Sequence, residues 1–148
     1  MSTDLAVLLD LPALLRAGGA LELVVVAANV PVLRRLDYAG NLVAASPIVR
    51  QIFWVHLGWI LLTLLASAGM DLAFPEALAG ASPLGRYVSG TLAVLWTLRL
   101  MAQQVLYDPA VRREHRVADV VFSLVFLFLA VVHGIAAVTA PLSGGATA

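Results

Sequence analysis

The sequence predicts an all-α integral membrane protein, a bundle of four transmembrane helices joined by short loops. Hydrophobic residues make up 61% of the 148 residues and charged residues only 12%, about half the charged share of an average soluble domain. Apolar stretches recur along the chain, each near the roughly 20 residues that cross a bilayer core. Because only short polar segments separate them, we expect residues 1–148 to form a single transmembrane domain.

The first predicted span covers residues 12–33. Asp10, just before the apolar stretch, is typical of a helix start, and the pair Arg34-Arg35 closes the stretch. Pro31 removes a backbone donor near the end of the span, so we expect the helix to bend or end there.

Three dipeptides predict the starts of the later helices, because Ser or Asp caps a helix and Pro suits its first turn. They are Ser46-Pro47, Ser82-Pro83 and Asp108-Pro109. The second span then covers residues 47–69 and the third residues 83–107. The fourth helix starts at Pro109, projects about two turns beyond the bilayer, and spans residues 117–140. We expect residues 141–148 to form a flexible tail.

Arginines at two of the predicted loops set the orientation. These are Arg34, Arg35, Arg50, Arg112, Arg113 and Arg116. Basic loops usually stay in the cytoplasm, so both termini are expected outside, and the same arginines form a patch that can contact lipid headgroups. All nine basic residues are Arg, which favours a GC-rich bacterial genome and therefore the bacterial inner membrane.

Polar side chains inside the spans predict an intramembrane polar core, because lipid offers them no hydrogen bonds. Its candidate members are Glu22, Asn29, His56, Arg99, Gln103 and His133. A central Arg costs about 2.5–3.5 kcal/mol to insert and usually finds a partner. Counting from the helix ends, Arg99 can reach Glu22, which predicts an ion pair. Such a pair either fixes helix order or belongs to a proton or substrate path.

Aromatic and histidine side chains are the other candidates for ligand contact. The aromatics Trp54, Trp59, Trp96 and Tyr107 either pack in the bundle or face a ligand. His56, which shares a stripe with Thr63 and Ser67, and His133 are possible haem ligands. Their depths differ by about 12 Å, which argues against one haem held by both. Apart from these two histidines as haem ligands, no metal site is predicted.

Several function classes have no support in the sequence. The chain has no Cys and a formal net charge of zero, which excludes thiolate chemistry within it and gives no sign of nucleic-acid binding. It also has no phosphate-binding loop, zinc-protease helix or nucleophile elbow. The absence of a catalytic motif favours a non-enzymatic protein.

Three functional hypotheses follow. The favoured one is an accessory subunit of a membrane complex, or a lipid- or quinone-binding protein, whose partners are membrane lipids and other subunits or a second copy. The alternative is a redox protein that binds haem or quinone through His56 or His133. The second alternative is a proton or small-ion pathway along His56, Arg99, Glu22 and His133.

Overall fold

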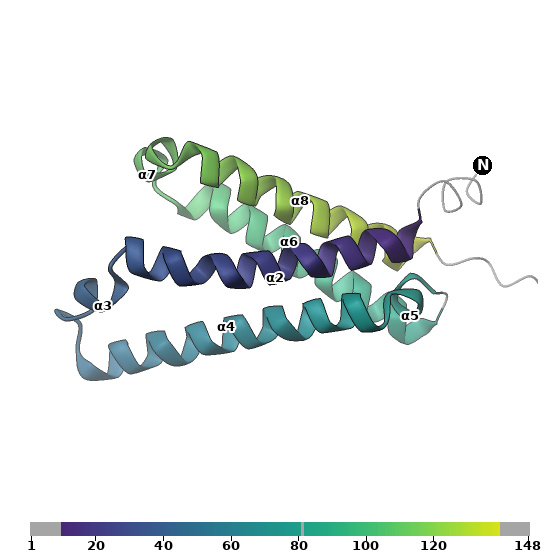
Figure 1. Ribbon diagram of the computed structural model, residues 1–148, viewed down its shortest axis with the longest axis horizontal. Coiled ribbons are helices and arrows are strands. Elements are labelled where there is room, and N and C mark those ends of the chain that lie inside the picture. Colours follow the sequence, from purple (N-terminus) through teal and green to yellow (C-terminus); the bar gives the residue numbers. More distant parts are fainter. Residues whose placement is uncertain (1–9, 81, 140–148) are drawn as a thin grey trace, which may run out of the picture.

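The computed structural model describes residues 10–80 and 82–139, and within them every regular element is a helix (Figure 1). The helices are α2 (Leu11–Arg35), α3 (Tyr38–Asn41), α4 (Pro47–Ala73), α5 (Pro75–Ala79), α6 (Pro83–Leu106), α7 (Pro109–Glu114) and α8 (Arg116–Val138). The predicted tail at 141–148 lies outside the described residues.

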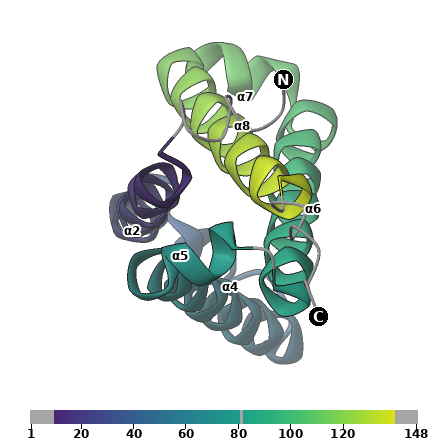
Figure 2. The same cartoon turned by 90° about the vertical axis from the view of Figure 1, so that its right-hand side faces the viewer.

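The four long helices form two antiparallel hairpins. α2 packs mainly on α4, and α6 packs mainly on α8. The hairpins meet where α2 contacts α8 and where α5 contacts α6. Figure 1 shows them closest at the end that carries α5 and spread apart toward the end that carries α3 and α7. Figure 2 looks onto the α5 end, where α5 lies beside α2. The arginine-rich connections therefore share one end of the bundle.

Capping side chains define most helix starts. The Asp10 carboxylate accepts from the Ala13 N–H at 3.2 Å, and the Ser82 hydroxyl accepts from the Gly85 N–H at 3.0 Å. Asp108 accepts from the Ala110 N–H at 2.7 Å. Each cap precedes a proline in the first turn, where the missing N–H costs nothing.

Three helix boundaries differ from the prediction. α2 continues through Pro31 to Arg35, because the lost hydrogen bond lies in its last turns. α4 continues past Gly69 to Ala73 and stops before Pro75, whose ring disfavours helical geometry at the preceding residue. The predicted helix from Pro109 onward is two helices, because the chain breaks at His115 with φ −108° and ψ 36°.

Three of the described helices, α2, α4 and α8, are long and apolar enough to cross a membrane. This indicates a membrane protein. α6 has 24 residues, but Arg86, Arg99, Gln103 and Gln104 lower its apolar content, and a fourth span is not confirmed. Large apolar side chains on α4, such as Val55, are exposed, as on a helix that faces lipid.

Two buried apolar clusters hold the hairpins together. One, near α5, contains Leu11, Leu15, Leu78, Val132 and Ala136. The other contains Val25, Leu92, Trp96, Phe126 and Leu129. Along α2 the two clusters leave an interval between Leu15 and Val25, and the buried Glu22 lies in it. On α8 the buried His133 lies between Val132 and Ala136 of the first cluster.

Candidate functional site

Three buried titratable side chains from three helices meet inside the bundle. They are Glu22 of α2, Asp71 of α4 and His133 of α8, and each is 0% exposed. Each offers an oxygen or a ring nitrogen that lies within 4.8 Å of those of the other two. We name this group the acid–histidine cluster.

Glu22 is held on one side and open on the other. Its Oε1 accepts a hydrogen bond from the Ser67 hydroxyl at 2.9 Å and one from the Trp96 indole N–H at 3.1 Å. Its Oε2 is buried and has no hydrogen-bond partner in the part of the chain that the structure describes. Two neighbouring helices therefore fix the carboxylate while one oxygen stays available.

Asp71 and His133 approach each other without forming a well-aligned hydrogen bond. The His133 Nε2 lies 3.3 Å from the Asp71 Oδ2. Among residues 10–80 and 82–139, both oxygens of Asp71 and both ring nitrogens of His133 lack a partner with hydrogen-bond geometry. Most buried polar atoms in proteins are satisfied, so five unpaired atoms in one cluster require an explanation.

Two glycines of α2 let its backbone approach α4 at the cluster. A Cβ atom on Gly19 would lie 2.9 Å from the Asp71 Cβ and 3.0 Å from the Ala68 carbonyl oxygen. A Cβ on Gly18 would lie 3.3 Å from the Asp71 Oδ2. The absence of side chains at 18 and 19 therefore allows Asp71 to point into the bundle beside Glu22.

No arginine of the described residues hydrogen-bonds to either acid of the cluster. Arg16 pairs with Glu76 of α5, and Arg86 donates to the Ala137 carbonyl at 3.0 Å. Buried carboxylates that lack such partners must be neutralised, because an unpaired charge in an apolar interior is very costly. Inside this cluster the compensation can come from the imidazole, a bound proton or a bound metal ion.

The predicted ion pair between Arg99 and Glu22 is wrong. Arg99 instead donates to the Tyr107 hydroxyl at 3.3 Å, and its guanidinium lies 4.6 Å from the centroid of the Phe126 ring. Trp96, one turn earlier on α6, takes the donor position on Glu22 and stacks on Phe126 with centroids 5.5 Å apart. Trp96, and not Arg99, is therefore the residue of α6 that hydrogen-bonds to Glu22.

The other predicted core residues lie apart from the cluster. Gln103 is buried and donates to the Asp119 carboxylate at 2.9 Å and to the Ser123 hydroxyl at 3.1 Å. Asn29 donates to the Val25 carbonyl of its own helix at 2.8 Å. His56 is exposed on α4, with its Nδ1 2.8 Å from the Ile52 carbonyl oxygen. Of the six candidates, the structure brings Glu22 and His133 together.

Most of the predicted aromatic and basic residues also lie away from the cluster. Trp96 is part of the cluster's surroundings, whereas Trp54, Trp59 and Tyr107 are exposed. Arg112 forms an ion pair with Asp119 at 3.1 Å and also donates to Gln104. The remaining basic residues, Arg34, Arg35, Arg50, Arg113 and Arg116, lie at the end of the bundle that carries α3 and α7 (Figure 1).

Asp71 is the member of the cluster that is absent from the predicted polar core, because the predicted second span ends at Gly69. Ser67, which donates to Glu22, appears in the sequence only as part of the stripe that includes His56 and Thr63. Thr63, Ser67 and Asp71 follow one another at intervals of four, which places them on one helix face. Extending that polar stripe by one turn would have identified Asp71.

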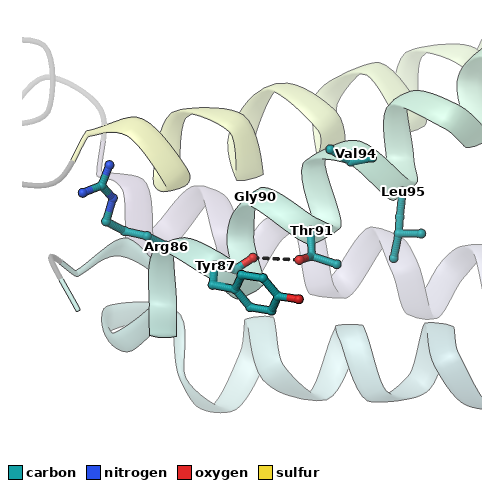
Figure 3. Close-up of a pocket in the computed structure, with 6 residues that line it drawn as sticks. All are labelled: Arg86, Tyr87, Gly90, Thr91, Val94 and Leu95. Atoms are coloured by element: carbon teal, nitrogen blue, oxygen red, sulfur yellow. Dashed lines mark hydrogen bonds between the residues drawn. The ribbon is translucent and has the colours of Figure 1, made fainter. Parts of the chain in front are cut away.

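A shallow hollow on α6 is separate from the cluster (Figure 3). Its lining residues are Arg86, Tyr87, Gly90, Thr91, Val94 and Leu95. The Thr91 hydroxyl donates to the Tyr87 carbonyl of the same helix at 2.8 Å, and Arg86 is bound to Ala137. These two side chains are already partnered, so the hollow offers little for recognising a polar ligand.

Comparison of the chain with protein-family models, with curated proteins and with solved structures found no match.

Proposed function

We propose that the protein is an integral membrane protein that binds a cation, a proton or a metal ion, at the acid–histidine cluster. One observation carries the proposal: three fully buried titratable side chains present five polar atoms without hydrogen-bond partners within the described residues. A buried polar atom left unsatisfied costs about 1–3 kcal/mol. A cation between the two carboxylates and the imidazole would remove much of that cost.

In this proposal all four long helices cross the membrane, α6 included. Several polar side chains of α6 have hydrogen-bond partners on α8 or on α6 itself, which lowers the cost of placing them in lipid. Gln103 is bound to α8, and the Thr91 and Thr97 hydroxyls donate to carbonyls of α6 itself, each at 2.8 Å. The arginine-rich end would face the cytoplasm, and the membrane would be the bacterial inner membrane.

A cation-binding role is compatible with an accessory subunit of a membrane complex and with an ion or proton pathway. Of the four residues of the predicted ion pathway, Glu22 and His133 belong to this site, whereas His56 and Arg99 lie outside it. The haem alternative has weaker support: His56 is exposed on α4 and His133 is fully buried, so the two histidines face different surroundings.

Infrared spectroscopy of the protein in lipid nanodiscs tests the proposal. A bound proton gives the C=O stretch of a buried carboxylic acid, and a bound metal ion gives carboxylate bands that change when a chelator removes it. We expect one of these signals in the wild type, its loss in Glu22→Gln and in Asp71→Asn, and its retention in Glu114→Gln, whose side chain is 75% exposed. Wild-type and Glu22→Gln spectra that match at every pH, with and without chelator, would refute the proposal.

A further inference from the structure

The three side chains of the cluster form a mixed set of metal ligands. Zinc in proteins binds carboxylate oxygens and imidazole nitrogens at about 2.0–2.2 Å with tetrahedral geometry, which places two ligand atoms about 3.3–3.6 Å apart. The His133 Nε2 and the Asp71 Oδ2 are 3.3 Å apart. Since all three ligand atoms lie within 4.8 Å of one another, no separation has to close by more than roughly 1.5 Å on binding.

Hydrogen bonds to Glu22 resemble the support that proteins give to a metal-binding carboxylate. Partners outside the ligand set commonly orient the ligands of a metal ion. Ser67 and Trp96 both donate to the Glu22 Oε1, which leaves the buried Oε2 as the oxygen that can bind. Glu22 is thus oriented before any ion arrives.

We propose that the acid–histidine cluster is a site for a divalent transition-metal ion of the zinc class, bound by the Glu22 Oε2, an oxygen of Asp71 and a ring nitrogen of His133. This inference rests on the proposed cation-binding function and names its ligand. It explains why the three side chains are fully buried while their ligand atoms lack partners within residues 10–80 and 82–139.

The donor set selects among metal ions. Calcium takes six to eight oxygens and magnesium near-octahedral oxygen coordination, which three side chains that include an imidazole do not supply. Sites for copper(I) depend on Cys or Met sulfur, and the chain has no Cys. Two carboxylates and one imidazole suit zinc, cobalt, iron or manganese. With three protein ligands, one tetrahedral position stays open for water or a substrate atom, as in catalytic zinc sites.

Titration with cobalt(II) alone tests the inference, because tetrahedral cobalt has a characteristic visible spectrum. The full-length protein is purified with chelator, freed of it, and titrated in nanodiscs. We expect one equivalent of cobalt to bind, and an equal amount of zinc to displace it because zinc binds such sites more tightly. Ser67→Ala should weaken binding about tenfold by removing one orienting hydrogen bond.

Two histidines in long helices provide a matched pair of variants. His133→Gln should lose the cobalt spectrum, whereas His56→Gln should keep it, since His56 is exposed and bound only to its own helix. Circular dichroism and size-exclusion chromatography show whether each variant is folded. If His133→Gln does not fold, Asp71→Asn takes its place, because it keeps the shape of the side chain.

The outcomes separate this inference from the function on which it rests. Cobalt binding that survives in both His133→Gln and Asp71→Asn places the metal elsewhere and overturns the inference. No cobalt binding, together with a carboxylic acid band that Glu22→Gln removes, leaves a proton-binding site without a metal: the inference fails and the proposed function stands. If both the cobalt spectrum and the infrared signal are absent, both proposals fail.

Discussion

Two groups of polar side chains join helices of this bundle, one partly exposed and one fully buried, and they differ in how many of their polar atoms have hydrogen-bond partners. The α6–α8 polar network (Gln103, Gln104, Arg112, Asp119 and Ser123) lies toward the end that carries α7. Its carboxylate, Asp119, accepts from Arg112 at 3.1 Å and from Gln103 at 2.9 Å. Ser123 accepts from both glutamines. The negative charge of Asp119 is thus offset by Arg112, and both Asp119 and Ser123 have hydrogen-bond donors within the network.

The acid–histidine cluster is fully buried, and most of its polar atoms have no hydrogen-bond partner among the described residues. It combines two carboxylates with one imidazole, and only the Glu22 Oε1 has hydrogen-bond donors among the described residues. A satisfied buried network rigidifies a fold, whereas a partly satisfied one is costly. Under the proposed cation-binding function, the α6–α8 polar network stabilises the fold, whereas the cluster is left incomplete for the ion that it binds.

Replacing the whole acid–histidine cluster with apolar side chains tests this difference most strongly. The triple variant is Glu22→Met/Asp71→Leu/His133→Leu. Without added metal, we expect its free energy of unfolding to equal or exceed that of the wild type. Apolar replacement of a buried charged group is often neutral or stabilising by about 1–4 kcal/mol. The measurement is unfolding by SDS in mixed micelles. A loss of several kcal/mol would mean that the cluster holds the fold together.

The close contact between α2 and α4 gives the next largest effect. Gly19→Ala should lower the free energy of unfolding by about 2 kcal/mol, because the new Cβ would overpack a tight contact with Asp71 and the Ala68 backbone. Gly58→Ala is the matched control: apart from the adjoining backbone of α4, no atom of the described residues lies within 4 Å of its added Cβ, so it should gain roughly 0.5–1 kcal/mol from helix propensity.

The same SDS unfolding assay measures both glycine variants. Equal stabilisation of the two would contradict the tight packing of α2 on α4. It would also remove the reason for which Asp71 points into the cluster.

The helix starts and the buried positions follow from local rules, whereas the pairing of side chains between helices does not. Asp10, Ser82 and Asp108 mark helix starts because a capping side chain and a following proline act within one turn. The interior position of Glu22 and His133 follows from the cost of exposing them to lipid. These features need no knowledge of how the hairpins meet.

The partner of Glu22 depended on a detail that no local rule contains. Trp96 and Arg99 are three residues apart on one face of α6, and either could have faced α2. The hairpins meet near α5 and spread toward α7 (Figure 1), so the residue nearer the start of α6 contacts Glu22. Asp71 lies outside the predicted core for a different reason: α4 extends one turn past Gly69, where the predicted span ends.

The smallest expected effect comes from the α6–α8 polar network, whose polar atoms have hydrogen-bond partners. Gln103→Met keeps the size of a buried side chain but removes its hydrogen bonds to Asp119 and Ser123. We expect the free energy of unfolding to fall by about 1 kcal/mol, the net value of a typical hydrogen bond. Gln51→Met, on the exposed side of α4, should change it by less than about 0.5 kcal/mol. The cluster replacement is expected to leave the free energy of unfolding unchanged or raise it, whereas Gln103→Met is expected to lower it. Changes of opposite sign in one assay would distinguish a site that serves a ligand from a network that stabilises the fold. Matching signs would mean that both groups serve the same purpose.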